Sequence, residues 1–206
     1  MPASRKINKD DIIRVCLDIV RKDGINGINA RRVAKELNCS TQPIFYLYKN
    51  MDEIKDDLYK EISNIYFNYI LNDSNTYKDT GLKYIKFAKD EPNFFKILFN
   101  GDNDGISSVD YNKSIGKVYE IISMQTGLSI QNAKMFNFRM WFYVNGIANL
   151  VANKTCDFSD EELGQLLREQ YVSMILYEYN RGNIKKKVVD KIIKDGLKRE
   201  RINKYE

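Results

Sequence analysis

Apolar residues recur at helical spacing along the whole of this sequence, and this periodicity constrains the fold more than any other feature. Alternation with a period of two, which marks a half-buried strand, is absent. One face of a first helix, expected at residues 9–23, carries Ile12, Ile13, Cys16, Ile19 and Val20. Asn8 is a suitable N-cap for this helix and Gly24 a suitable stop. The pattern predicts an all-α fold.

Capping residues divide the rest of the chain into further helices. Helices are expected at residues 30–37, 51–72, 76–90, 92–100, 110–126, 131–153, 160–179 and 184–202. Asn29 can cap the first of these, while Asn50 with Glu53 and Ser159 with Glu162 form capping-box patterns. Residues 101–108, GDNDGISS, are expected to form a loop, and Gly127 is expected to end a helix.

The charge is distributed unevenly. Of the 206 residues, the first 60 hold 12 basic and 9 acidic side chains and residues 181–206 hold 10 and 4, whereas the middle is acidic. Basic ends on an acidic body are typical of a polyanion-binding terminus joined to a body with another role, although a solvated surface gives the same pattern.

Several function classes are disfavoured by what the sequence lacks. It has no histidine, and its three cysteines, Cys16, Cys39 and Cys156, are widely spaced. No catalytic residues, metal ligands or cofactor are therefore expected, and an enzyme is disfavoured. Because there is no secretory signal and no stretch approaching about 20 apolar residues, we expect a cytoplasmic protein without a membrane span.

The stretch STQPIFYLY, residues 40–48, predicts a short helix with two different faces. With Ser40 as N-cap, Pro43 falls in the first turn, where its missing N–H costs little. At about 100° per residue, one face carries Ile44, Phe45 and Tyr48 and is expected to be core. The opposite face carries Gln42, Pro43, Tyr46 and Lys49.

A short helix, a three-residue turn and this second helix have the geometry of a helix-turn-helix, whose second helix enters the major groove of DNA. Gln42 can offer its amide to adenine, Thr41 can contact a base or phosphate, and Pro43 can pack on a thymine methyl. The other expected DNA-binding residues are Arg31, Arg32, Ser40, Tyr46, Lys49 and Asn50. Two short helices in a small bundle, with the tyrosines in its core, remain the alternative.

Residues 28–58 resemble the N-terminal domain of TetR-family transcriptional regulators. The matching positions are Ile28, Asn29, Val33, Ala34, Asn38, Cys39, Ser40, Ile44, Phe45, Tyr48, Asp52, Glu53 and Ile54. Asn38 replaces the usual Gly, and Asn also enters left-handed backbone conformations. Leu47 and Met51 stand where phosphate-contacting residues are common in the family, and Cys39 stands where Val is common, as a small core residue.

The resemblance implies two domains: a three-helix DNA-binding domain at residues 1–50 and a helical ligand-binding and dimerisation domain at 51–206. Residues 51–72 would connect them, and 184–202 would be an additional basic helix with Ile184, Val188, Ile192 and Leu197 on its apolar side. The family forms homodimers through its last two main helices. The corresponding residues here are Leu163, Leu166, Leu167, Tyr171, Met174, Ile175 and Tyr177.

Residues 141–153, WFYVNGIANLVAN, also resemble the WHG type of TetR C-terminal domain, with Asn145 in place of the His. Such a domain encloses a pocket for a small apolar or amphipathic inducer. The candidate lining residues are Tyr84, Phe87, Phe94, Phe95, Phe99, Tyr119, Phe138, Trp141, Phe142 and Asn145. The expected function is a ligand-responsive regulator, a repressor that binds a palindromic DNA operator as a homodimer and is released when an inducer shifts helix 51–72. The alternative is an interaction or membrane-surface protein that uses helix 184–202 on anionic lipid.

Overall fold

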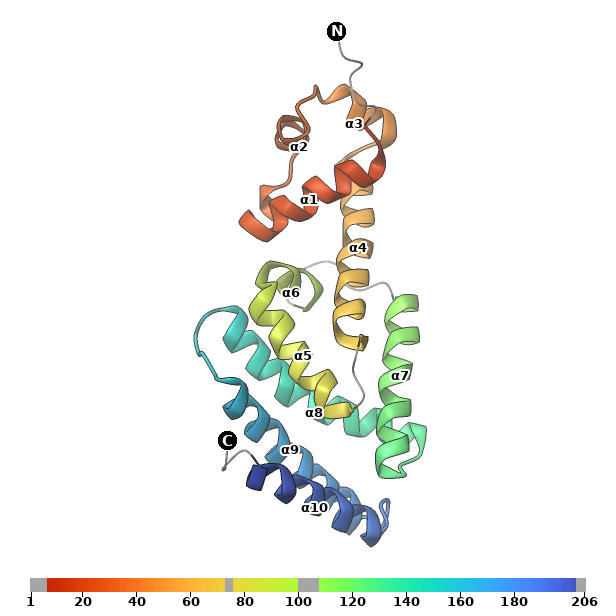
Figure 1. The fold of residues 1–206 in the computed structure, drawn as a ribbon. Coiled ribbons are helices and arrows are strands. Elements are labelled where there is room, and N and C mark those ends of the chain that lie inside the picture. The colour runs from red at the N-terminus through yellow and green to blue at the C-terminus, as the bar shows by residue number, and fades with distance from the viewer. Residues whose placement is uncertain (1–6, 73–75, 100–107, 203–206) are drawn as a thin grey trace. The chain divides into compact units, whose positions relative to one another are not determined.

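The computed structural model describes residues 7–72, 76–99 and 108–202, with 108–114 and 195–202 described by their backbone alone. Every regular element in these ranges is a helix (Figure 1), so the all-α prediction is confirmed. The elements in chain order are α1 (Lys9–Asp23), η1 (Ile25–Gly27), α2 (Ala30–Glu36), α3 (Gln42–Leu47), α4 (Met51–Leu71), α5 (Tyr77–Asp90), α6 (Pro92–Phe99), α7 (Ser108–Thr126), α8 (Ile130–Ala152), α9 (Asp160–Asn180) and α10 (Lys186–Ile202). Residues 101–107 of the expected loop at 101–108 lie outside the described residues, and Ser108 is the first residue of α7.

Most helix ends lie within two residues of their predicted positions because the caps are local. Asn8 Oδ1 accepts a hydrogen bond from Asp11 N (2.8 Å), and the Asp11 carboxylate accepts one from Asn8 N, which closes a capping box at the start of α1. The α1 helix ends at Gly24, whose φ of 73° favours glycine. Ser159 and Glu162 form the second predicted box, at the start of α9. The short 3₁₀ turn η1 was not predicted.

The helices pack as two compact units. The first unit comprises residues 1–69 and 87–110, and the second comprises 70–86 and 111–206. The first unit therefore contains α1–α3 together with most of α4, the end of α5, and α6. This division by packing differs from the functional boundary expected at residue 50, which stays a prediction.

In the first unit, α6 is attached to α1. Arg21 Nε donates to both carboxylate oxygens of Glu91 (3.0 and 3.2 Å), and its guanidinium lies 4.9 Å from the Phe94 ring centroid. Asn93 Nδ2 also donates to the Arg21 carbonyl oxygen (2.9 Å). The core beside this contact contains the apolar face of α1, in which Ile12, Cys16, Ile19 and Val20 are buried; Ile13 is only half-buried.

The second unit has its own core, and α10 belongs to it. Buried residues of α7, α8 and α9 meet Ile184 and Val189, with Val188 and Ile192 packed against them. As far as Lys194, the apolar residues of the basic helix thus pack in or against the chain's own core, apart from exposed Ile193; the side chain of Leu197 lies outside the described part. None of the described helices is both long and apolar enough to cross a membrane.

Candidate nucleic-acid interface

The α3 helix begins one residue later than predicted. Its N-cap is Thr41, with φ −70° and ψ −17° and no side-chain capping bond, so the prediction that Ser40 caps this helix is wrong. Ser40 lies exposed in the turn. Pro43 is the second helical residue, still within the first turn, where no backbone donor is lost.

The roll of α3 is set by two buried side chains, Ile44 and Tyr48. At about 100° per residue, Tyr46 lies roughly opposite the midpoint between them, and it is 78% exposed. Gln42 and Lys49 are also exposed, while Thr41 and Pro43 are half-buried. The predicted outward face therefore has the expected orientation.

The position of Phe45 differs from the prediction. It was expected in the core, but its side chain is 44% exposed beside Tyr46. Its position about 100° from Ile44 places it at the edge of the buried face rather than within it. The sequence analysis did not place Phe45 among the exposed residues of α3. A helix of six residues buries only a narrow stripe, and this was the signal that could have indicated its exposure.

Gln42 and Tyr46 are joined on the outward face. The Gln42 side-chain amide Nε2 donates to the Tyr46 hydroxyl at 2.7 Å. The two residues are four apart and so lie one above the other on the helix. The contact makes them a single polar unit on the exposed side of α3.

The turn between α2 and α3 is held by its backbone. Cys39 N donates to Ala34 O (2.9 Å) and Asn38 N to Lys35 O (3.1 Å). Asn38 has φ 52°, the left-handed conformation expected for it in place of glycine. The Cys39 side chain is half-buried, and burial raises the pKa of its thiol. A turn with these bonds fixes the angle between the two short helices.

The two arginines of α2, Arg31 and Arg32, differ in their exposure and in their contacts. Arg31 is exposed and available to a phosphate. The Arg32 guanidinium forms an ion pair with Asp23 at the end of α1, and its backbone N–H donates to the Asn29 cap (3.0 Å). Arg32 thus ties α2 to α1 and would reach DNA only by leaving Asp23.

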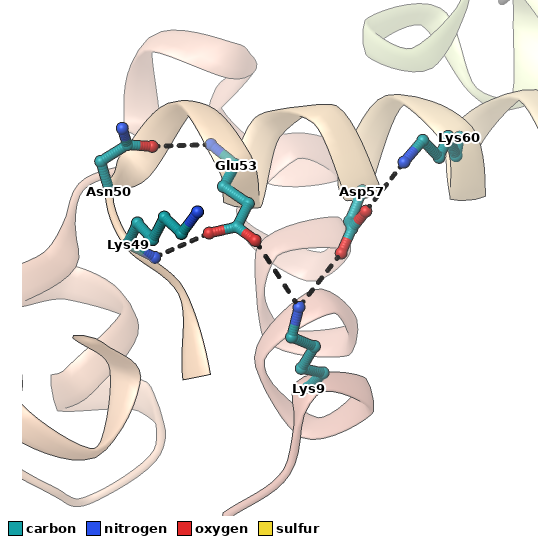
Figure 2. Close-up of polar contacts among 6 residues, drawn as sticks. All are labelled: Lys9, Lys49, Asn50, Glu53, Asp57 and Lys60. Carbon is teal, nitrogen blue, oxygen red and sulfur yellow. Dashed lines mark hydrogen bonds and ion pairs between the residues drawn. The ribbon is translucent and has the colours of Figure 1, made fainter. Parts of the chain in front are cut away.

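A polar cluster links the start of α4 to α1 and to the residues that precede α4 (Figure 2). Asn50 Oδ1 accepts from Glu53 N (2.9 Å), and Glu53 Oε2 accepts from Lys49 N (2.7 Å). Lys9 of α1 lies 3.9 Å from both the Glu53 and Asp57 carboxylates.

The same lysine also lies over an aromatic ring. Lys9 Nζ is 4.2 Å from the Tyr48 ring centroid, and burial raises the pKa of the Tyr48 phenol. Lys60 donates to Asp57 (3.1 Å), which lowers the pKa of that carboxyl. Asn50 therefore serves as a cap and Lys9 as a clamp between α1 and α4, while the Lys49 side chain stays exposed.

The expected ligand-lining residues are divided between the two units. In the first unit, Phe87 and Phe99 pack edge-on against Tyr66 of α4, at centroid distances of 5.3 and 5.2 Å. Phe95 adjoins Phe99 at 5.0 Å. Phe94 instead faces Arg21 in the α1–α6 contact.

In the second unit, the Tyr84 hydroxyl donates to Asn145 Oδ1 (2.9 Å), which brings two of the expected residues together. Tyr119 packs at the edge of the core. Phe138 and Phe142 are exposed and Trp141 half-buried, with the two phenylalanine rings 4.9 Å apart. These three rings of α8 form an outward cluster.

The residues expected at a dimer interface mostly serve the chain's own core. Four of them, Leu163, Leu167, Met174 and Ile175, are buried in the isolated chain. Leu166 and Tyr171 are half-buried, and the Tyr171 ring packs against Phe136. Of the set, Tyr177 alone is exposed. The exposed apolar stripe lies instead on α8, at Met135, Phe138 and Phe142.

In the described part of the chain, no three acidic or cysteine side chains come together as a group that could hold a metal ion.

Comparison with known proteins gives matches among solved structures. No protein-family model and no curated protein matches the chain. A TetR-family transcriptional regulator from Haemophilus influenzae has a TM-score of 0.55 and 13% identity, over 79% of this chain and 93% of that one. The transcriptional regulator FadR from Bacillus subtilis, in complex with stearoyl-CoA, gives 0.54 and 14%, over 82% and 98%. The fatty acid degradation regulator FadR from Bacillus halodurans gives 0.50 and 13%, over 81% and 94%. At these identities the likeness establishes the fold.

Proposed function

We propose that this chain, which has the fold of TetR-family regulators, is a ligand-responsive transcriptional regulator that binds a palindromic DNA operator as a homodimer. The observation that carries the proposal is the outward face of α3, where Gln42 and Tyr46 are exposed opposite buried Ile44 and Tyr48. Backbone hydrogen bonds in the turn position this face relative to α2, and Lys9 links α1 to Tyr48 and to α4. These are the requirements of a helix that enters the major groove.

Side chains of the helix-turn-helix have separate roles in this proposal. The Gln42 amide reads adenine, and Phe45 joins Pro43 as an apolar contact for thymine methyls. Thr41 and Ser40, at the start of α3, and Asn50, through its amide nitrogen, contact the sugar-phosphate backbone with Lys49 and Arg31. Arg32 contributes mainly by fixing α2 against Asp23.

The second copy is proposed to dock on the exposed apolar stripe of α8. Met135, Phe138 and Phe142 recur three and four residues apart, so they share one side of the helix. Exposed Leu176 and Tyr177 of α9 are further candidates. Sedimentation of Phe142→Lys tests this: the wild type should sediment as a dimer and the variant as a monomer. A dimeric Phe142→Lys protein would show that this face is not the interface.

The ligand is proposed to be apolar or amphipathic, and to loosen DNA binding. Tyr66 of α4 packs on Phe87 and Phe99, so a ligand that displaces these rings acts directly on α4. A structural neighbour was solved with stearoyl-CoA, which makes long acyl thioesters the first compounds to test here. A coupling of about 1–3 kcal/mol would weaken operator binding roughly 5- to 150-fold. Equal operator affinity with and without a bound acyl thioester would contradict this coupling for that ligand class.

The experiment that tests DNA binding is selection of duplexes from a random pool, followed by gel shifts over a salt series. The wild type should select a palindrome whose half-sites lie one helical turn, or a multiple of it, apart. Gln42→Ala should cost about 1–3 kcal/mol at one base pair of each half-site. Arg31→Ala should weaken binding to all sequences and flatten the salt slope. A wild-type protein that enriches no sequence would overturn the proposal.

A further inference from the structure

The most exposed large side chain of α3 does not contribute to the core. Tyr46 lies on the side of the helix facing away from Ile44 and Tyr48, and its hydroxyl accepts a hydrogen bond from the side-chain amide of Gln42. A surface pair four residues apart on a helix contributes little to helix stability, about 0.2–0.5 kcal/mol. Helix stability therefore does not explain why a tyrosine occupies position 46. Its hydrogen bond to the Gln42 amide offers an explanation.

The hydrogen bond to Tyr46 leaves the Gln42 amide with one N–H donor and its carbonyl acceptor for a base. A glutamine amide has two N–H donors and one carbonyl acceptor. One N–H is used on the Tyr46 hydroxyl at 2.7 Å. The other N–H and the carbonyl oxygen remain, and they are the donor and acceptor that adenine N7 and N6 require in the major groove.

The same bond restricts how the amide can rotate. A free glutamine side chain exchanges its oxygen and nitrogen ends by rotation, so it presents either one to a base and loses rotamer freedom when it binds. Because a tyrosine hydroxyl both donates and accepts, the bond fixes the position of the side chain, and in the structure the amide nitrogen is the end at Tyr46. Preorganisation of this kind raises affinity and selectivity by lowering the ordering cost of binding.

We infer that Tyr46 is a positioning residue for base recognition: its hydroxyl holds the Gln42 side chain in the position from which the amide reads adenine. This inference rests on the proposed DNA-binding function and adds to it the residue that sets specificity. The tyrosine acts through Gln42, so its removal affects one base pair of each half-site and leaves binding to other DNA unchanged.

A double-mutant cycle tests the inference. Wild type, Tyr46→Phe, Gln42→Ala and the double variant are titrated with the selected site, with the same site carrying G·C for A·T at each position in turn, and with an unrelated duplex. Tyr179→Phe, which removes a hydroxyl from an exposed tyrosine of α9, is the matched control. Equal unfolding midpoints establish that the variants are folded, as expected for changes on exposed side chains.

The wild type should prefer A·T at one position by about 5- to 150-fold, and Gln42→Ala should abolish that preference. Tyr46→Phe should reduce it by about 2- to 12-fold, the effect of one hydrogen bond, with unchanged affinity for the unrelated duplex. It should have no further effect in the Gln42→Ala background.

Two results would overturn the inference while leaving the proposed function intact. One is full A·T preference in Tyr46→Phe. The other is an equal loss on every duplex that persists without Gln42, which would make Tyr46 an independent phosphate contact. If the wild type discriminates no sequence at all, the proposed function fails, and the inference fails with it.

Discussion

Replacing Arg139 by methionine should destabilise the second unit strongly, because it leaves a charge buried. The Glu178 side chain of α9 is 4% exposed and accepts hydrogen bonds from Arg139 Nη1 of α8 and from Asn183 Nδ2, both at 2.7 Å. Arg139→Met removes the only one of these two partners that carries a charge. The arginine also stacks on Tyr177, 5.0 Å from its ring centroid.

The expected loss is about 3 kcal/mol. Breaking a buried ion pair by removing one partner costs about 3–5 kcal/mol, and the lower value applies because the Arg139 side chain is 37% exposed and water can replace it. For a chain of 206 residues this corresponds to a fall in Tm of roughly 6–12 °C. Thermal and urea unfolding, followed by circular dichroism at one protein concentration, measures both quantities.

Two variants make the test specific to burial. Lys60→Met breaks an ion pair of similar length, 3.1 Å to Asp57, but its lysine is 63% exposed, so it should cost no more than about 1 kcal/mol. Arg139→Met with Glu178→Gln should recover much of the loss, because the buried group is then neutral. If Arg139→Met costs no more than Lys60→Met, or if the added Glu178→Gln recovers nothing, the reasoning is refuted.

Three further predictions concern the first unit. Ile44→Ala, at a fully buried site, should cost about 2–5 kcal/mol of unfolding free energy, whereas Phe45→Ala should cost under about 1 kcal/mol and weaken operator binding instead; equal costs in urea unfolding would contradict the observed roll of α3. Asn38→Gly should leave stability unchanged or raise it, while Asn38→Val should lower it by about 1–2 kcal/mol because φ is 52°; the reverse order in thermal unfolding would exclude this turn conformation. Burial raises the pKa of the Cys16 thiol from 9.0 to about 12, so the unfolded chain loses this proton first and the stability contribution of Cys16, full below about pH 9, falls by about 1.4 kcal/mol per pH unit above it. The stability difference between wild type and Cys16→Ala, measured from pH 8 to 11, should show that slope, and a flat difference would place Cys16 at the surface.

The helix boundaries were predictable because their signals are local. Asn8 bonds to a residue three positions away, and Ser159 does the same at the start of α9. Gly24 ends α1 through its own φ. None of these interactions needs a distant part of the chain, so a single sequence contains all the information. The Ser40 cap was predicted wrongly because α3 begins one residue later, and its N-cap, Thr41, makes no side-chain capping bond that the sequence could have signalled.

The environment of each apolar residue was less predictable because it depends on which neighbour covers it. Phe94 and Phe95 are adjacent and both buried, yet Phe94 meets Arg21 of α1 while Phe95 meets Phe99. Likewise Met174 and Ile175 of α9 were expected at an interface with a second subunit, and in the single chain they are buried in the core that includes Ile184 and Val189. Periodicity identifies a buried face without identifying the partner.

The most direct test of the central claim, that the outward face of α3 reads DNA, is photo-cross-linking from that face. A photoreactive phenylalanine derivative replaces Tyr46 in one sample and exposed Tyr179 of α9 in another. Each protein is irradiated with a duplex bearing the selected site, and the cross-linked nucleotides are mapped. Cross-links from position 46 to bases inside each half-site, with none from position 179, are predicted. A complex that forms fully but gives no cross-link from position 46 would contradict the account.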